Sequence, residues 1–417
     1  MAGNQSTADR NFSETNQSNQ HEVEDVKIQS TNYEDKQTQG KTNGPPWIPT
    51  KIDESFSLKV GTDCSGMETP LIALGNLGVP FKSKFSCDND KDVQTTILAN
   101  HLPEYLYENI EFRDNKKVPY VDLYVAGFPC QPFSTAGKQQ GFHDAKGRGT
   151  IFHSVLDYIK VQLPKVFILE NVKGLTTLEN GKYMNAIMKS LKGIKLPKGR
   201  NHGQAYDIYH EVLNTRDHGV PHNRPRWYCV GIRKDVNQGG FTFPTPIPCP
   251  SLDDFMGDAS SSTDGNFKKY STVADNIKRA KDRITKEGYD PDKEPYVVDI
   301  DASKSRSRHA YNYSPCITRS RYKGHWLTNK KRRMTLQEMM RLQGMDHSHF
   351  VKKVSDHRLG EQIGNAMSVN VLERLIRQIM LVTDFSIPET GCYSYHGQVD
   401  IHVGPDRWFN NQALADI

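Results

Sequence analysis

The sequence predicts an α/β fold with a Rossmann-like sheet, helices on both faces of that sheet, and a smaller irregular domain. Short β-branched and aromatic runs alternate with amphipathic helical stretches between residues 56 and 235. Glycine or polar residues follow these runs, and open α/β sheets bind ligands at the edge where such strands end. The alternation then stops, because residues 240–300 are rich in Pro, Asp, Ser and Gly.

The composition of the 417-residue chain is that of an intracellular protein with a basic body. Its net charge is +5, but residues 1–50 hold seven acids and only four bases, so the remainder is expected to bind a polyanion. No apolar run approaches the roughly 18 residues that a membrane-spanning helix needs. Seven cysteines without a C-x-x-C pair predict reduced thiols and no structural zinc site.

The first ordered unit contains a turn suited to a nucleotide-like ligand. A strand near Phe56–Val60 leads into the turn G-T-D-C-S-G-M-E-T-P, and a helix follows. Such a turn offers backbone N–H groups and a helix N-terminus to the ligand. The next strand-like run ends at Asp88, which either accepts hydrogen bonds from ribose hydroxyls or caps the following helix.

The stretch Ala126–Ser134, A-G-F-P-C-Q-P-F-S, follows a short buried strand at Val121–Val125. Prolines on both sides of Cys130 fix φ, so its thiol is expected on a stiff loop at the sheet edge. A buried structural cysteine is the alternative. The Gly-rich, charged residues 137–149 come next and are suited to closing over a substrate.

A carboxylate is predicted at the same edge of the sheet. The helix Thr150–Leu163 leads to a buried strand, Lys165–Leu169, and Glu170 stands directly after that strand. A carboxylate beside an apolar pocket there could hold a proton near neutral pH.

Two arginines precede a further strand at Trp227–Ile232. Arg224 and Arg226 have the alternating spacing that places two side chains on one face of a strand. His218 and His222 lie nearby, but no third ligand has the spacing of a metal site. We therefore interpret both histidines as solvated or hydrogen-bonded.

Residues 302–333 contain ten basic residues and no acid, with four aromatic residues between them. Bases interleaved with aromatics are typical of contacts with phosphates and unstacked nucleobases, although a solvated surface is the alternative. The run Lys330–Arg333 also fits a nuclear import signal. A helix capped by Thr335 and Glu338 follows, and a long amphipathic helix ends near Val382.

Five motifs in family order make the chain similar to the DNA (cytosine-5) methyltransferases. G-F-P-C-Q-P-F-S at 127–134 resembles the nucleophile motif, E-N-V at 170–172 the glutamate motif, and R-P-R at 224–226 the arginine motif. R-M-T-L-Q-E-M-M-R-L-Q-G and Q-I-G-N-A complete the set. The resemblance covers Leu58–Met380 and implies the Rossmann-like sheet of class I methyltransferases.

The composition and the resemblance together divide the chain into five segments. We expect a disordered polar tail at 1–50, a catalytic and cofactor-binding domain at 56–235, a target-recognition domain at 236–330, a return to the catalytic domain with a closing helix at 331–385, and a C-terminal tail at 386–417.

The resemblance implies methyl transfer from S-adenosylmethionine to C5 of a flipped-out cytosine in DNA. The Cys130 thiolate would add to C6, and Glu170 would hold N3 and the exocyclic amine of the base. Arg226, with Arg224, would favour the thiolate and orient the base.

The resemblance also implies a cofactor site, and four positions of the chain, one of them before the arginine pair, depart from the usual family residues. Cys64 replaces an aromatic residue, Glu68 a glycine, Asn109 an acid and His222 a glutamine. The expected cofactor-binding residues are Cys64, Ser65, Gly66, Asp88, Asn109, Ile110, Ile151, Asn365 and Met367.

Double-stranded DNA is the expected partner, with no metal or membrane and a monomer in catalysis. We expect the protein to act inside the cell with the DNA, in the nucleus if the cell is eukaryotic. The alternatives are a tRNA cytosine-5 methyltransferase of the same fold and a catalytically silent DNA-binding homologue. The expected DNA contacts are Arg319, Arg321, Lys323, Lys331 and Arg332.

Overall fold

In the computed structural model, residues 57–129, 151–196, 203–257 and 271–385 are described, together with the backbone of Val26–Lys27. Cys130, residues 137–149, the C-terminal tail and nearly all of the N-terminal tail lie outside the described residues. The predictions made for those segments therefore stay predictions.

Within the described residues, the larger sheet has eight strands in the order β1-β4-β3-β2-β5-β6-β8-β7. The strands are β1 (Val26–Lys27), β2 (Leu58–Asp63), β3 (Phe81–Cys87), β4 (Tyr105–Tyr107), β5 (Leu123–Ala126), β6 (Val166–Val172), β7 (Tyr206–Asn214) and β8 (Pro225–Arg233). The five strands from β4 to β6 in this order are parallel, whereas β8 is antiparallel to both β6 and β7. The carboxyl ends of the parallel strands meet at one edge, as the sequence predicts.

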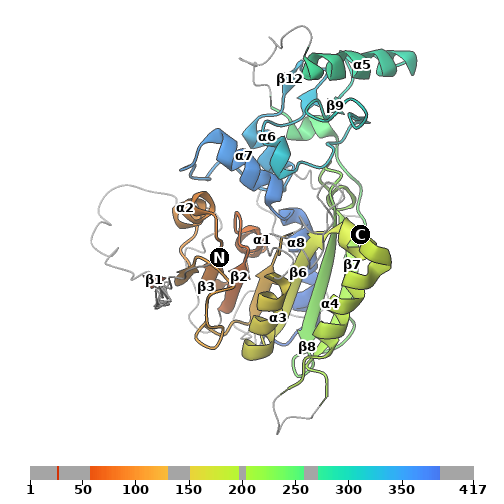
Figure 1. Cartoon of the computed structure of the whole chain (residues 1–417). Coiled ribbons are helices and arrows are strands. Elements are labelled where there is room, and N and C mark those ends of the chain that lie inside the picture. Colours follow the sequence, from red (N-terminus) through yellow and green to blue (C-terminus); the bar gives the residue numbers. More distant parts are fainter. Residues whose placement is uncertain (1–25, 28–56, 130–150, 197–202, 258–270, 386–417) are drawn as a thin grey trace, which may run out of the picture.

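Helices cover both faces of this sheet (Figure 1). One core contains α1 (Thr69–Asn76) and α8 (Val369–Val382), and the other contains α3 (Ile151–Gln162) and α4 (Lys182–Lys192). Side chains of β5 alternate between the two cores: Leu123 and Val125 join the first, Tyr124 and Ala126 the second. Because successive side chains of a strand point to opposite faces, every residue of β5 is buried when both faces are covered. The predicted α/β sheet with helices on both faces is confirmed.

A second, antiparallel sheet with the strand order β10-β9-β11-β12 forms the smaller unit in the described part of the chain. Its strands are β9 (Tyr296–Val298), β10 (His309–Tyr311), β11 (Trp326–Leu327) and β12 (Arg332–Arg333). Helix α5 (Thr272–Lys286) packs on it through Val273, Ile277 and Ala280. Figure 1 shows this unit beyond α6 and α7, at the end of the molecule away from α3.

The remaining elements connect the two units or flank the larger sheet. They are α2 (Lys91–Asn100), α6 (Leu336–Arg341), α7 (Asp356–Asn365) and the 3-10 helices η3 (Lys173–Thr176), η4 (Leu178–Gly181), η5 (Thr215–Asp217), η6 (Leu252–Phe255) and η7 (Arg319–Arg321). Among the described helices, none combines the length and the apolar character that a bilayer span requires. Phe241 and Phe255, which fall within the predicted target-recognition segment, belong to the same hydrophobic core as α1 and α8, and this core also includes Val297 and Leu327 of the smaller sheet.

A buried ion pair stands at the carboxyl end of β2. The guanidinium of Arg113 binds the Asp63 carboxylate through two hydrogen bonds of 2.7 and 2.6 Å, and the two side chains are 2% and 0% exposed. Three aromatic rings surround the guanidinium, and the Tyr124 hydroxyl donates to the same carboxylate. Because Asp63 directly precedes the predicted cofactor turn, this ion pair fixes where that turn begins.

We predict that Arg113→Met destabilises the protein by roughly 3–5 kcal/mol, because it leaves the Asp63 carboxylate buried without a counter-charge. Urea denaturation followed by circular dichroism measures the change. The exposed Lys91–Glu108 ion pair supplies the control, since Lys91→Met should leave the transition in place. Similar midpoints for the two variants would contradict this account of Arg113.

Candidate active site

Glu170 and Arg226 meet because β6 and β8 are paired antiparallel. The register places Glu170 opposite Tyr228, so Arg226 lies two residues away on the same face of the sheet. The Arg226 Nε is 3.2 Å from Glu170 Oε1, and the side chains are 12% and 11% exposed. The carboxylate and this arginine, both expected in the active site, are therefore in direct contact in the structure.

Glu170 stands after the buried run V-F-I-L, so its carboxyl group is largely withdrawn from water. Burial raises the pKa of Glu170 above its ordinary value, while Arg226 and Arg224 oppose the change without cancelling it. The carboxyl group can thus retain a proton at a higher pH than an exposed glutamate would.

The Cys130 loop begins beside this carboxyl group. A Cβ placed on Gly127 would lie 3.6 Å from Glu170 Oε2 and 2.7 Å from Cε at the flexible end of Met367, so the backbone runs close to both side chains here. Asn171 donates a hydrogen bond to the Phe128 carbonyl oxygen. The chain is therefore held against the glutamate motif up to the residues just before Cys130.

Arg224 has a different environment from Arg226. Its guanidinium is 2% exposed and donates to the carbonyl oxygens of Ile317 at 2.8 Å and Ala366 at 2.7 Å. A third hydrogen bond, of 3.3 Å, reaches the Gly364 carbonyl oxygen. Arg224 therefore joins the end of α7 to the smaller unit, and we reassign it from base orientation to positioning.

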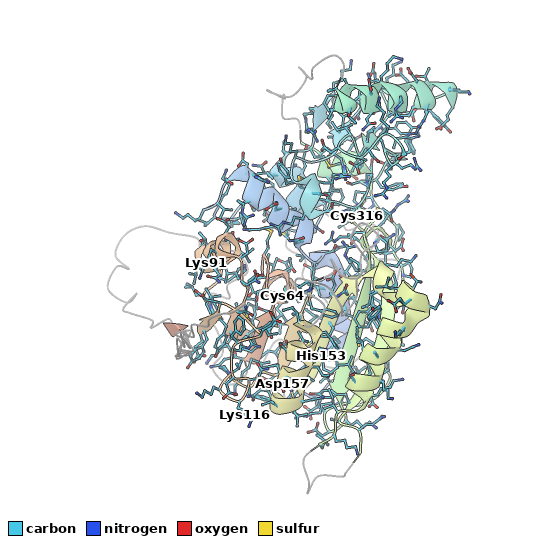
Figure 2. All side chains as sticks on the ribbon, in the orientation of Figure 1. Cys64, Lys91, Lys116, His153, Asp157 and Cys316 are labelled. Carbon is cyan, nitrogen blue, oxygen red and sulfur yellow. The ribbon has the colours of Figure 1, made fainter. Side chains whose placement is uncertain are left out.

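Cys316 also lies at this site, between the two arginines. Its Sγ lies 3.6 Å from Nη1 of Arg224 and 3.6 Å from Nη2 of Arg226. Figure 2 shows Cys316 between the larger and smaller units, whereas Cys64 lies over the sheet of the larger unit. The sequence gives no direct signal, because Cys316 stands in a stretch dominated by basic residues.

The predicted cofactor turn has unusual backbone geometry. Cys64, Gly66 and Glu68 all have left-handed conformations, with φ of 52°, 56° and 54°. The Ser65 hydroxyl accepts from the Cys87 N–H at 2.9 Å, and the Gly66 N–H donates to Asp88 Oδ2 at 3.1 Å. Both contacts fix the turn against the end of β3.

The alternative role considered for Asp88 is wrong. Helix α2 is capped by Asp90, whose side chain accepts from the Asp92 N–H. Asp88 is partly exposed and accepts from Gly66 and Asp90 N–H groups, and burial raises its pKa. Its place beside the turn keeps the ribose interaction as a prediction.

The other predicted cofactor residues surround the same sheet edge. Ile110 and Ile151 are buried in one hydrophobic core, and Cys64 packs against it. Asn109 follows β4, and its amide oxygen already accepts from the Glu111 N–H at 2.8 Å. Asn365 is exposed at the end of α7, and Met367 is buried close to Gly127.

Glu68 is accommodated by turning its carboxyl group into the protein. The side chain is fully buried, and Oε1 accepts from the Thr62 hydroxyl at 2.7 Å. Burial raises the pKa of Glu68 to about 7. Glu68, which stands where the family usually has glycine, therefore keeps a left-handed backbone conformation and directs its carboxyl group into the protein.

Both histidines before β8 are hydrogen-bonded, as predicted. His222 Nδ1 lies 2.9 Å from the Leu342 carbonyl oxygen, and its Nε2 accepts from the Ile317 N–H at 3.0 Å. His218 Nδ1 pairs with Arg374 at 2.9 Å. Burial lowers the pKa of His218 to about 4, with a contribution from Arg374. No group of three or more potential metal ligands occurs among the described residues.

The basic stretch is less free than its sequence indicates, because acids from other segments reach it. Arg319 pairs with Glu361, and Arg321 pairs with Asp299. Arg332 is 5% exposed.

Arg332 donates to both oxygens of Glu338. The prediction that Arg332 contacts DNA is corrected, since its guanidinium is enclosed in that ion pair. Lys323 and Lys331 remain exposed, although Lys331 lies 3.8 Å from Asp292.

Comparison with known proteins decides the family. The model of the family described as C-5 cytosine-specific DNA methylase matches residues 61–381. The chain belongs to this family. It is 33% identical over 305 residues to the Type II methyltransferase M.HaeII of Haemophilus aegyptius, covering 73% of this chain and 87% of that protein. This enzyme is thus a DNA cytosine-5 methyltransferase.

Further similarities agree with this assignment. M.NgoBI, a Type II methyltransferase of Neisseria gonorrhoeae, is 30% identical over 334 residues, which cover 78% of this chain and 96% of that protein. The methyltransferase EhMeth of Entamoeba histolytica has a similar structure, with a TM-score of 0.54 and 16% identity over 78% of this chain and 98% of that chain. The Dnmt2 methyltransferase of S. pombe has a TM-score of 0.51 and 15% identity, and the match covers 78% of this chain and 98% of that chain. At these identities the two structures establish the fold alone.

We predict that wild type loses up to about 3 kcal/mol of stability relative to Glu68→Gln as pH rises from 4.5 to about 7. The raised pKa keeps Glu68 protonated when folded, whereas the unfolded chain ionises near pH 4.5. The amide of the variant does not titrate and can still accept from Thr62. Urea denaturation at several pH values checks the prediction, and parallel pH profiles would contradict it.

Proposed function

We propose that this methyltransferase transfers the methyl group of S-adenosylmethionine to C5 of a flipped-out cytosine in duplex DNA, through a transient bond between Cys130 and the base. The observation that carries the proposal is the shared edge of β5, β6 and β8. There Glu170, with its raised pKa, contacts Arg226 beside the start of the Cys130 loop.

Glu170 has the properties required to bind the Watson–Crick edge of cytosine. A protonated carboxyl group donates one hydrogen bond and accepts another, which matches N3 and the exocyclic amine of the base. As negative charge develops on the ring, Glu170 gives its proton to N3. Arg226 holds the carboxyl group in place and stabilises the carboxylate that remains.

Cys130 supplies the covalent step. Its thiolate adds to C6, a carbon–sulfur bond forms, and the electrons of the C5–C6 double bond make C5 nucleophilic. After C5 is methylated, the C5 proton leaves and the Cys130–C6 bond breaks, which restores the double bond. Because C6 is inaccessible in a stacked duplex, the base must first leave the helix at a cost of a few kcal/mol.

The open surroundings of Gly66 support placing the cofactor over the turn after β2. A Cβ built on Gly66 would meet no atom closer than the Cys64 carbonyl oxygen at 4.0 Å, so open space lies over the turn. The partly exposed Asp88 carboxylate is suited to ribose hydroxyls, and Ile110 and Ile151 to the adenine ring. When bound, S-adenosylmethionine supplies an electrophilic methyl group.

We further propose that Arg319, Arg321, Lys323 and Lys331 contact DNA phosphates. Lys323 and Lys331 are exposed, while the two arginines would have to exchange a carboxylate partner for phosphate. Double-stranded DNA is the proposed substrate, acted on inside the cell by a single protomer. The curated relatives support DNA over tRNA, because the chain is 30–33% identical to Type II methyltransferases.

We predict that labelled S-adenosylmethionine methylates duplex DNA with wild type, not at all with Cys130→Ala, and roughly 100-fold or more slowly with Glu170→Gln, whose amide cannot give N3 a proton. Filter-bound label measures the transfer. The matched control is Cys249→Ala, which removes a thiol outside the site and should keep wild-type activity.

A parallel incubation with tRNA tests the substrate class. Label that enters tRNA alone would overturn the choice of DNA. Equal methyl transfer by wild type and Cys130→Ala would overturn the assigned nucleophile.

A further inference from the structure

Arg224 carries a buried positive charge for which no carboxylate lies within hydrogen-bond distance among the described residues. Its hydrogen bonds go to three main-chain carbonyl oxygens and to Cys316 Sγ, and its Nε has no partner in the described part of the chain. A buried guanidinium without an anion is costly, since carbonyl dipoles replace only part of its hydration. The site therefore requires a nearby negative charge.

Cys316 is the group placed to supply that charge. Its sulfur lies 3.6 Å from a nitrogen of each guanidinium, so two cations face one thiol. Glu170, the other acid nearby, contacts Arg226 on its Nε side at 3.2 Å. The ionisable groups thus follow one another in the order Glu170–Arg226–Cys316–Arg224, so that each arginine has an acidic group beside it.

The protonation behaviour agrees with this arrangement. Burial raises the pKa of Cys316, but the opposing effects of Arg226 and Arg224 prevail and leave the pKa below its ordinary value of 9.0. Cys249 offers a contrast in the same protein. It is also partly exposed, yet burial raises its pKa to about 11.

We propose that Cys316 is held as a thiolate that balances the charge of Arg224, and that it is a second chemically modifiable thiol in the target-base pocket, distinct from Cys130. The location of Cys316 in that pocket rests on the proposed function, in which Glu170 and Arg226 are the groups that bind the cytosine. The reagents expected to modify Cys316 are soft carbon electrophiles that enter the pocket from solvent. Cys316 is partly exposed to solvent, so such reagents can reach its sulfur.

The reaction with iodoacetamide shows the chemistry. The Cys316 thiolate attacks the methylene carbon, a sulfur–carbon bond forms, and iodide leaves with the electron pair of the carbon–iodine bond. The thiol is already ionised, so no proton has to be removed. The product is a neutral thioether, so the negative charge that balances Arg224 would be lost. The amide of the attached group would lie beside Arg226.

The test is alkylation of the full-length Cys130→Ala protein by limiting iodoacetamide at pH 7, followed by mass spectrometry of proteolytic peptides. We expect Cys316 to react at least about 10-fold faster than Cys249, because a far larger fraction of it is thiolate. An equal or slower rate at Cys316 would overturn the proposal. Cys130→Ala removes the other thiol of the site and leaves the described contacts of Cys316 intact.

A second arm locates the thiol relative to the base. Duplex DNA with S-adenosylhomocysteine should protect Cys316 and leave the alkylation of Cys249 unchanged. Fast reaction without protection, in an enzyme that methylates DNA, would refute the location in the pocket. Fast reaction in a protein that methylates neither DNA nor tRNA would refute the proposed function while the thiolate stands.

Discussion

The antiparallel pairing of β8 with β6 is the constraint on which the proposed active site depends. The other neighbour of β6, strand β5, is parallel to it, whereas β8 begins at the carboxyl edge of β6 and runs away from that edge. Those first residues carry Arg226, and the last residues of β6 carry Glu170. A one-residue slip in register would turn one of the two side chains to the opposite face and separate the charges.

Arg224 makes the smaller unit part of this site. Its guanidinium binds the main chain at Ile317 and at the end of α7, through Gly364 and Ala366, while His222 accepts the Ile317 N–H. The same segment carries Cys316 to the arginines. A Cβ on Gly364 would come within 2.3 Å of the Thr318 backbone, so α7 also requires this close approach. The smaller unit and the residues of the proposed active site are thereby joined through a few main-chain hydrogen bonds.

The sequence was informative where a pattern is local and incomplete where partners are distant. Apolar runs ending in polar residues predict β5, β6 and the position of Glu170, because strand burial and strand ends are local properties. The sequence of residues 302–333 does not reveal that three of its arginines pair with acids outside the stretch, namely Glu361, Asp299 and Glu338. Cys316 was not recognised as a site residue because only the tertiary structure places it between two guanidiniums.

The central claim is that Cys130 forms a bond with the cytosine that Glu170 and Arg226 hold. A long duplex in which 5-fluorocytosine replaces cytosine tests it most directly, because fluorine cannot leave as the C5 proton does and elimination is blocked. With S-adenosylmethionine present, the account predicts a covalent protein–DNA complex whose linked peptide contains Cys130. DNA methylation by the enzyme without such a complex, or with the bond on another residue, would contradict the account.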